Sequence, residues 1–199
     1  MKYTLPEFIK EYGHILHDTF NISDVIVDDN YVKAYIKDTI VAEFPMILYG
    51  GIYVMHGVYK AYLLNGSKKY KVYYKNGEYH REDGPAYCQW NYDKTKNHEL
   101  YYKNGKLHRE DGPTSIYWHS SGKIRFVSYK ANGKQHRIDG PAYQYYDVDG
   151  KLIEESYHIN GELHREDGPA RYINREGVVT LEYYYHGKKY EPTLTKAAH

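Results

Sequence analysis

Four copies of a short polar sequence contain the residues best suited to chemistry. His-Arg-Glu-Asp-Gly-Pro begins at His80, His108 and His164, and a variant with Ile138 in place of the glutamate begins at His136. Histidine can exchange a proton near neutral pH, and an arginine guanidinium can hold a phosphate or carboxylate through two hydrogen bonds. The four copies are 28 residues apart. The same chemical groups therefore recur at a fixed period along the chain.

Repetition argues against catalysis, because a catalytic centre needs one asymmetric set of side chains. We name no catalytic residue and no cofactor-binding residue, and we expect that the chain is not an enzyme. An enzyme with an unrecognised site is the alternative. We also predict no metal site, since one histidine and one aspartate per copy do not close a coordination shell. Cys88 is the only cysteine, and its position within an expected strand favours a packing role.

The repeated loops have two interpretations. In the first they are tight turns, with the glycine supplying a positive φ angle, the aspartate accepting from its own backbone and the proline beginning the next strand. In the second, the histidines and arginines form a ladder along one sheet edge, with about 10 Å between copies, that binds anions or nucleotides. The glycines of the first interpretation are Gly84, Gly112, Gly140 and Gly168. The ladder of the second consists of His80, Arg81, His108, Arg109, His136, Arg137, His164 and Arg165.

The segments that must position these loops are typical of β-strands. Each 28-residue unit holds two strand-like stretches, for example 114–119 and 123–131, and an Asn-Gly pair four residues before each histidine. Two strands per unit keep all units in the same orientation, whereas three would reverse the direction with each repeat. The sequence therefore predicts a mainly β fold, an elongated antiparallel meander of 28-residue two-strand repeats. A tyrosine column should keep the same period, with members Tyr73, Tyr101, Tyr129, Tyr157 and Tyr185.

The repeat resembles a known family. The segment 140–152, Gly-Pro-Ala-Tyr-Gln-Tyr-Tyr-Asp-Val-Asp-Gly-Lys-Leu, and the Tyr-His-Ile-Asn-Gly of 157–161 are similar to the MORN-type repeat, in particular to the bacterial YwqK-like "antitoxin component". The His-Arg-Glu-Asp-Gly-Pro-Ala variety resembles repeats of tailed phages and giant viruses. The resemblance covers about 50–190 and implies a MORN-like β-repeat fold. It also implies a binding or scaffold module, with a host protein that is bound and blocked as the partner.

The two ends of the chain differ from the repeats. Residues 1–45 predict a small α+β cap, with one helix near residues 5–20 and a strand pair at 24–27 and 31–36. The cap would cover an open sheet edge; a separate recognition module is the alternative. Residues 46–199 form the expected MORN-like domain, with regular units over about 76–190 and degenerate first and last repeats.

Composition favours a protein partner. Lys plus Arg total 27 and Asp plus Glu total 26, a balance that argues against nucleic acid, and no stretch is long enough for a membrane span. A single cysteine and the lack of a signal-like start lead us to expect a cytoplasmic protein, in the host cytoplasm if it is phage or viral. The oligomeric state is left open. The 27 tyrosines indicate half-exposed aromatic faces, and the candidate binding surface consists of Trp90, Trp118, Tyr146, Tyr145, Tyr183 and Tyr185.

Overall fold

A computed structural model describes residues 2–3, 22–28 and 30–192 of the chain. All regular elements in these residues are β-strands, so the predicted mainly β class is confirmed. The helix expected near residues 5–20 lies outside the described residues. Contacts divide the chain into two compact units, Met1–Lys106 and Leu107–His199. The described part of the chain contains no helix of the length and apolar character that crossing a membrane would require.

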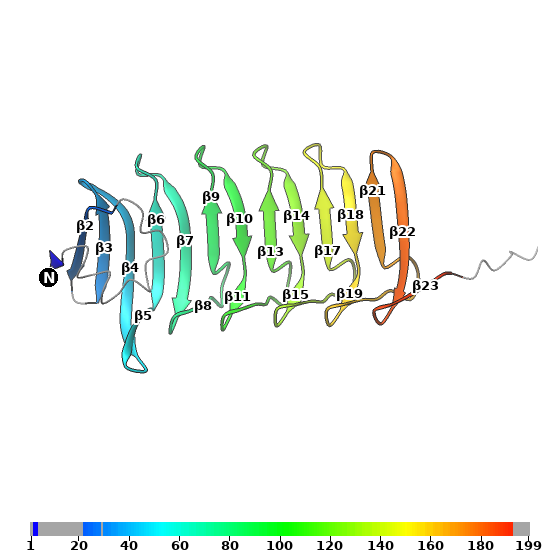
Figure 1. Cartoon of the computed structure of the whole chain (residues 1–199), viewed down its shortest axis with the longest axis horizontal. Helices are drawn as coiled ribbons and strands as arrows, with labels where there is room; N and C mark the ends of the chain where they lie inside the picture. The colour runs from blue at the N-terminus through cyan, green and yellow to red at the C-terminus, as the bar shows by residue number, and fades with distance from the viewer. Residues whose placement is uncertain (1, 4–21, 29, 193–199) are drawn as a thin grey trace, which may run out of the picture. The chain divides into compact units, whose positions relative to one another are not determined.

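The first unit is an antiparallel meander (Figure 1). Successive pairings join β1 to β2, β2 to β3, β3 to β4, β4 to β6, β6 to β7, β7 to β9 and β9 to β10. The predicted strand pair near the N-terminus is present as β2 and β3. The strands of this unit are β1 (Lys2–Tyr3), β2 (Asp24–Asp28), β3 (Tyr31–Ile36), β4 (Thr39–Tyr49), β5 (Ile52–Met55), β6 (Gly57–Tyr62), β7 (Lys68–Lys75), β8 (Glu78–Tyr79), β9 (Tyr87–Trp90), β10 (Lys96–Leu100) and β11 (Tyr102–Lys103).

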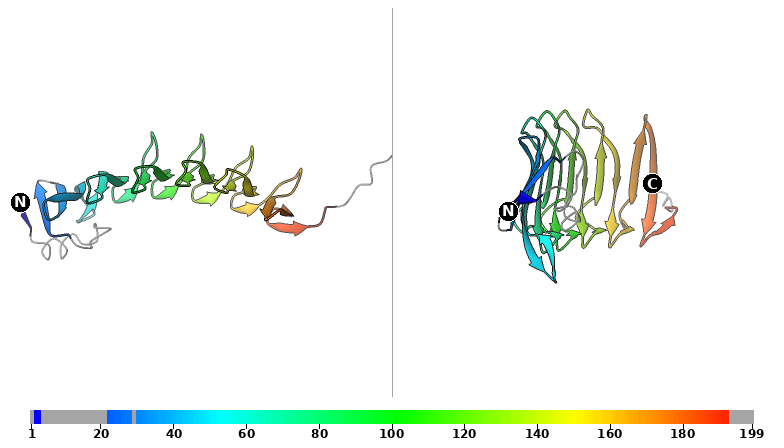
Figure 2. Two further views of the ribbon diagram at one scale, coloured as in Figure 1. Left: turned by 90° about the horizontal axis from the view of Figure 1, so that it is seen from above. Right: turned by 60° about the vertical axis from the view of Figure 1, so that its left-hand side comes forward.

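A hairpin extends from this sheet beyond the ends of the neighbouring strands. β4 is the longest strand and continues into β5 through a turn at Gly50–Gly51, where both glycines have positive φ angles. The hairpin is drawn in cyan at the lower side of the sheet (Figure 2). β4 also passes through residue 45, the expected boundary between cap and repeats.

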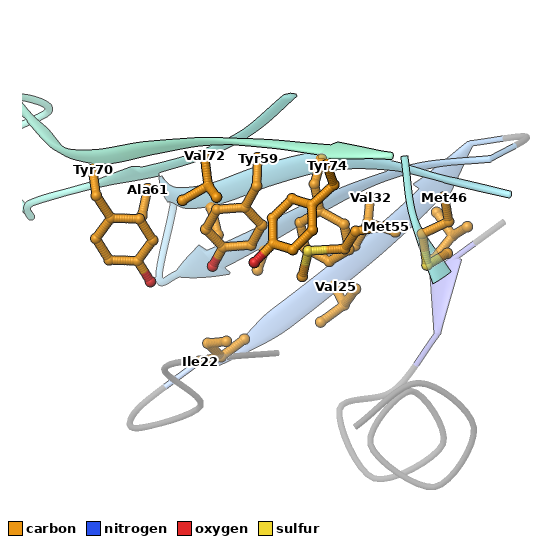
Figure 3. Packing of buried hydrophobic residues seen from close by; sticks show 14 residues of the cluster. Ile22, Val25, Val32, Met46, Met55, Tyr59, Ala61, Tyr70, Val72 and Tyr74 are labelled. Carbon is orange, nitrogen blue, oxygen red and sulfur yellow. The ribbon is translucent and has the colours of Figure 1, made fainter. Parts of the chain in front are cut away.

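The buried core of the first unit lies on one face of its strands. Residues two apart in a strand point to the same face, and the alternation in β4 buries Ala42, Phe44 and Met46 at 5%, 0% and 1% exposure. Val25 and Val32 are fully buried on β2 and β3. Figure 3 shows these side chains packed with those of later strands. Residues on both sides of position 45 share this core.

The second unit repeats one pattern. Two longer strands form an antiparallel pair, as β13 and β14 do. A short hairpin of two strands with two residues each follows, as in the pairing of β15 with β16. This arrangement agrees with the predicted two strands and one ordered loop per repeat. The short hairpin belongs to the ordered loop. β12 (Lys106–Leu107) crosses the boundary between the units. The strands of the second unit are β13 (Ser115–Trp118), β14 (Ile124–Ser128), β15 (Lys130–Ala131), β16 (Lys134–Gln135), β17 (Tyr143–Tyr146), β18 (Leu152–Ser156), β19 (His158–Ile159), β20 (Glu162–Leu163), β21 (Arg171–Arg175), β22 (Val178–Tyr185) and β23 (Lys188–Tyr190).

The last repeat is two residues shorter than the period predicts. The Gly161 N–H donates to the Gln135 carbonyl, and the Gly187 N–H makes the equivalent bond to Leu163. The final turn therefore arrives two residues early, and Tyr183 takes the position that the 28-residue period assigns to Tyr185. The prediction that Tyr185 continues the tyrosine column is wrong for this reason.

Candidate functional site

The Asn-Gly pairs form the tightest turns of the repeats. Asn132 has a φ angle of 51° and Gly133 one of 85°, and the other three pairs are similar. Two consecutive positive φ angles define a type I′ turn, whose twist matches that of the flanking strands. Asparagine tolerates this conformation better than most side chains. These turns set the start of each His-Arg loop.

Each arginine of the repeated motif folds back over its own loop. The Arg137 Nε donates to Asp139 at 2.9 Å, and its terminal nitrogen donates to the Pro141 carbonyl at 3.4 Å. The guanidinium also stacks on the Tyr129 ring, with 4.0 Å to the ring centroid. Arg81 and Arg165 repeat all three contacts. The arginine thus ties the loop to the preceding tyrosine instead of reaching toward solvent.

The glycine of the motif makes room for this arginine side chain and does not supply a turn conformation. The prediction that Gly84, Gly112, Gly140 and Gly168 have positive φ angles is wrong, because none of the four does. A Cβ atom on Gly112 would instead lie 2.9 Å from the Arg109 Cζ, and the other three positions give 3.0–3.2 Å. Only a residue without a side chain leaves room for the guanidinium to lie against the backbone. The Asp-Gly-Pro segment therefore forms the binding surface for the arginine guanidinium, and we call this contact the arginine site.

Each histidine of the motif connects its repeat to the next one. The His136 Nδ1 accepts a hydrogen bond from the Asn160 backbone N–H at 3.1 Å. Three further motif histidines make the same bond to the following turn, at 3.1–3.3 Å. His56, ahead of the four motifs, makes the same bond to the Asn76 N–H at 3.3 Å. An accepting Nδ1 carries no proton, so this bond requires the Nε2 tautomer.

The loop carboxylates respond to the arginines. Hydrogen bonds from the neighbouring guanidinium lower the pKa of Asp83, Asp111, Asp139 and Asp167 below the ordinary aspartate value. The arginine side chains remain 23–26% exposed. In the second unit the loops at 108–112 and 136–139 flank a groove with Tyr129 in its lining. The first two loops of the second unit therefore lie beside one groove, but their hydrogen-bonding groups are already engaged, the arginines within their own loop and the histidines with the following turn.

An aromatic cluster lies on one face of the second unit. The strand register pairs Tyr117 with Phe126 and Phe126 with Tyr145, and Tyr143 lies two residues from Tyr145 on the same strand. The Tyr117 and Phe126 rings stack with 4.2 Å between centroids, and Phe126 lies 5.9 Å from Tyr143. All four side chains are half-buried. We call Tyr117, Phe126, Tyr143 and Tyr145 the aromatic face.

The equivalent face of the first unit carries a similar series of rings, and all but the last of them are buried. Phe44 stacks on Tyr59, Tyr59 on Tyr70 and Tyr70 on Tyr87, with centroid distances of 5.1, 5.6 and 6.1 Å. Phe44, Tyr59 and Tyr70 are 0%, 2% and 7% exposed. The residue at Tyr87 recurs as Tyr143 two repeats later. At the same period Tyr59 is equivalent to Tyr143 and Tyr70 to Phe126, so these two positions are core in the first unit and half-buried in the second, whereas Tyr87 is half-buried like Tyr143.

The candidate surface residues fall on both faces. Tyr145 belongs to the aromatic face, whereas Trp118 and Tyr146 lie on the opposite face near the strand ends. In the first unit Trp90 lies beside the ammonium group of Lys68 at 5.8 Å. At the end of the second unit Tyr183 packs against Tyr190 and Tyr185 against His164. The candidates of the second unit therefore lie on both faces of its strands and do not form one patch.

Three members of the aromatic face are absent from the sequence-based set: Tyr117, Phe126 and Tyr143. The signal that finds them is the two-residue alternation combined with the strand register, because facing residues of neighbouring strands lie on the same side. The 28-residue period alone selects Trp90, Trp118 and Tyr146, because these residues occupy the same position in successive repeats. It does not select residues that become neighbours only through pairing between β14 and β17.

Cys88 is buried within β9 at 8% exposure. Burial, and then the charge of Glu99, raise the pKa of its thiol above the ordinary cysteine value. In the described residues no three histidine, cysteine, aspartate or glutamate side chains are grouped so that they could hold a metal ion. No protein-family model, curated protein or solved structure matches this chain.

Proposed function

We propose that this chain is a non-catalytic binding or scaffold module that recognises another protein through the aromatic face. The observation that carries the proposal is the contrast between the two units. Tyr59 and Tyr70 are core in the first unit, whereas Tyr143 and Phe126 at the equivalent positions of the second unit are half-exposed. Clustered, half-exposed aromatic side chains on a rigid sheet are typical of protein interfaces, where tyrosine supplies a large contact area and a hydroxyl group.

The repeated loops support this assignment by elimination. Each arginine, aspartate and histidine of the loops at 80–85, 136–141 and 164–169 has a hydrogen-bond partner inside the repeat array. Binding an anion at an arginine would require breaking its bond to the aspartate, the carbonyl or both. Binding at the aromatic face would leave these loop bonds intact. The resemblance to phage and giant-virus repeats makes a host protein the first partner class to test.

The experiment compares the two faces and the loops with one partner. The partner is captured from host lysate on the full chain, identified by mass spectrometry and purified. Tyr145→Ala on the aromatic face should weaken its affinity by about 2 kcal/mol or more, which is roughly 30-fold, as expected for an aromatic hot spot. Trp118→Ala, on the opposite face, is the matched aromatic control and should change the affinity little.

The loop variant tests the alternative function. Replacing Arg109 and Arg137 together by lysine keeps the charge but loses the bidentate geometry. If the aromatic face is the site, this double variant should bind as the wild type does. Loss of binding in the double variant with normal binding by Tyr145→Ala would refute the proposal and favour an anion-binding ladder.

A further inference from the structure

One edge of the last long strand in the second unit lacks a strand partner among the described residues. β22 pairs with β21 over Val178–Glu182 and with β23 over Tyr183–Tyr185. The Arg165 N–H donates to the Tyr184 carbonyl at 3.1 Å, so Tyr184 turns its backbone groups toward the preceding repeat. Backbone groups alternate sides along an antiparallel strand. Val179 and Leu181 therefore turn their N–H and C=O groups to the open edge.

Interior repeats show what this edge can accept. Tyr157 occupies the position equivalent to Tyr183, and its N–H donates at 2.8 Å to the carbonyl of Ala170, the residue just before the following strand. That strand, β21, pairs antiparallel with β18 while the short β19–β20 hairpin remains in place. The residue opposite the tyrosine is small and fully buried, as Ala142 and Ala170 show. The open edge of β22 is therefore a template for an antiparallel strand with a small residue opposite Tyr183.

The exposed side chains at this edge are apolar. Val178, Val179 and Leu181 are 69%, 50% and 47% exposed. The nearby Glu182 already contacts Arg171 at 3.5 Å and Lys189 at 3.1 Å, so it presents no uncompensated charge to an incoming strand. Natural sheets usually protect such edges with charge or proline. An unprotected apolar edge at the end of a repeat array favours pairing with another strand.

We propose that β22 pairs with β22 of a second copy of this chain, about a two-fold axis at Thr180. In this register Val179 lies opposite Leu181 of the partner subunit, which brings outward backbone groups and apolar side chains together. Gly177, the turn residue before β22 with a φ angle of 88°, then lies nearest to Tyr183 of the partner subunit and has no side chain to clash with this tyrosine. An axis at Leu181 would place Val179 opposite Tyr183, where the interior repeats hold alanine. An axis at Val179 would place Arg175 in the small-residue position.

Charged substitutions of Thr180 test this register directly. Residues on the axis face their own copies, and like charges directly opposite each other in a sheet repel. The wild type should sediment with about twice the 23.5 kDa mass of one chain. Thr180→Lys and Thr180→Glu should each be monomeric by analytical ultracentrifugation. An equimolar mixture of the two variants should recover the dimer, because lysine then faces glutamate.

Two further variants separate pairing from damage to the fold. Val179→Pro removes an N–H that faces the open edge and should raise the dimer dissociation constant about tenfold or more. Ile124→Lys, at a 42% exposed position on interior strand β14, should leave the dimer intact. Circular dichroism should show wild-type β content in every variant. A monomeric wild type, a dimeric Thr180→Lys variant, or a monomer that dimerises only after deletion of residues 193–199 would each overturn the proposal.

Discussion

The arginine site in the third His-Arg loop gives the sharpest prediction about the repeat. A Cβ atom at Gly140 would lie 3.1 Å from the Arg137 Cζ and 3.4 Å from its Nε. Gly140→Ala should therefore push the guanidinium off the Tyr129 ring, which it contacts at 4.0 Å. A partly exposed cation–π contact contributes about 0.5–1 kcal/mol. We expect Gly140→Ala to lower the free energy of unfolding by about 1 kcal/mol.

The effect of Gly140→Ala on the free energy of unfolding should change sign when Arg137 is absent. With Arg137→Ala the space is empty, and the φ angle of Gly140 is not in the left-handed region. Alanine then only reduces the freedom of the unfolded chain, so Gly140→Ala should be neutral or stabilise by up to about 1 kcal/mol. Gly133→Ala is the control: its φ angle is +85° and nothing lies within 4 Å of its Cβ, so it should destabilise equally in both backgrounds.

Urea unfolding of the four-protein cycle, followed by circular dichroism, measures these differences. The coupling between positions 137 and 140 is the quantity of interest, because it cancels effects that each substitution has alone. A Gly140→Ala variant that is destabilised by the same amount with and without Arg137 would refute the arginine-site reasoning. It would mean that the backbone conformation, and not the close approach of the guanidinium, requires glycine.

Two further predictions concern buried titratable groups. His158 Nδ1 is shielded from solvent, and burial of the ring lowers its pKa below the ordinary value of 6.5, against a smaller opposing effect of a backbone hydrogen bond at Ser156 and with a further contribution from the charge of Arg171. The unfolded chain therefore takes up the proton first, so stability should be complete above about pH 6.5 and fall as the pH decreases below it. The pH dependence of unfolding should be shallower in His158→Phe, and an unchanged slope would contradict the burial of this ring. Cys88 should react slowly with a thiol reagent at neutral pH and fully in denaturant, because burial raises its pKa; equal rates in both would contradict its placement in the sheet.

The strands and their period could be predicted because they depend on local signals. Asn132–Gly133 requires a type I′ turn whatever surrounds it, and the tyrosine-rich stretches on either side have only strand-like alternation. Two strands per repeat followed from the identical sequences of the units. These features need no knowledge of which residues meet across the sheet.

The chemistry of the loops could not be predicted in the same way. Gly140 was expected to supply a turn conformation, but its role depends on where the Arg137 side chain folds, which is a tertiary contact. The bond between His136 and the Asn160 N–H joins residues of neighbouring repeats and is invisible in the spacing. The short last repeat was missed because the tyrosines at 183–185 offer three positions for one column.

The aromatic face was only partly found for a related reason. Tyr145 was identified because it lies next to Tyr146, so the two must point to opposite faces. Phe126 becomes its neighbour only through the register between β14 and β17. A one-residue change in that register would move Phe126 to the other side of the sheet.

A footprint of the bound partner tests the proposed function most directly. Hydroxyl-radical labelling of the full chain, read by mass spectrometry with and without the purified partner, reports the solvent access of each aromatic side chain. The proposed function predicts protection of Tyr117, Phe126, Tyr143 and Tyr145, with unchanged labelling of Trp118 and of the histidines in the His-Arg loops. Protection of those histidines with unchanged labelling of the aromatic face would contradict it and place the partner on the loop edge.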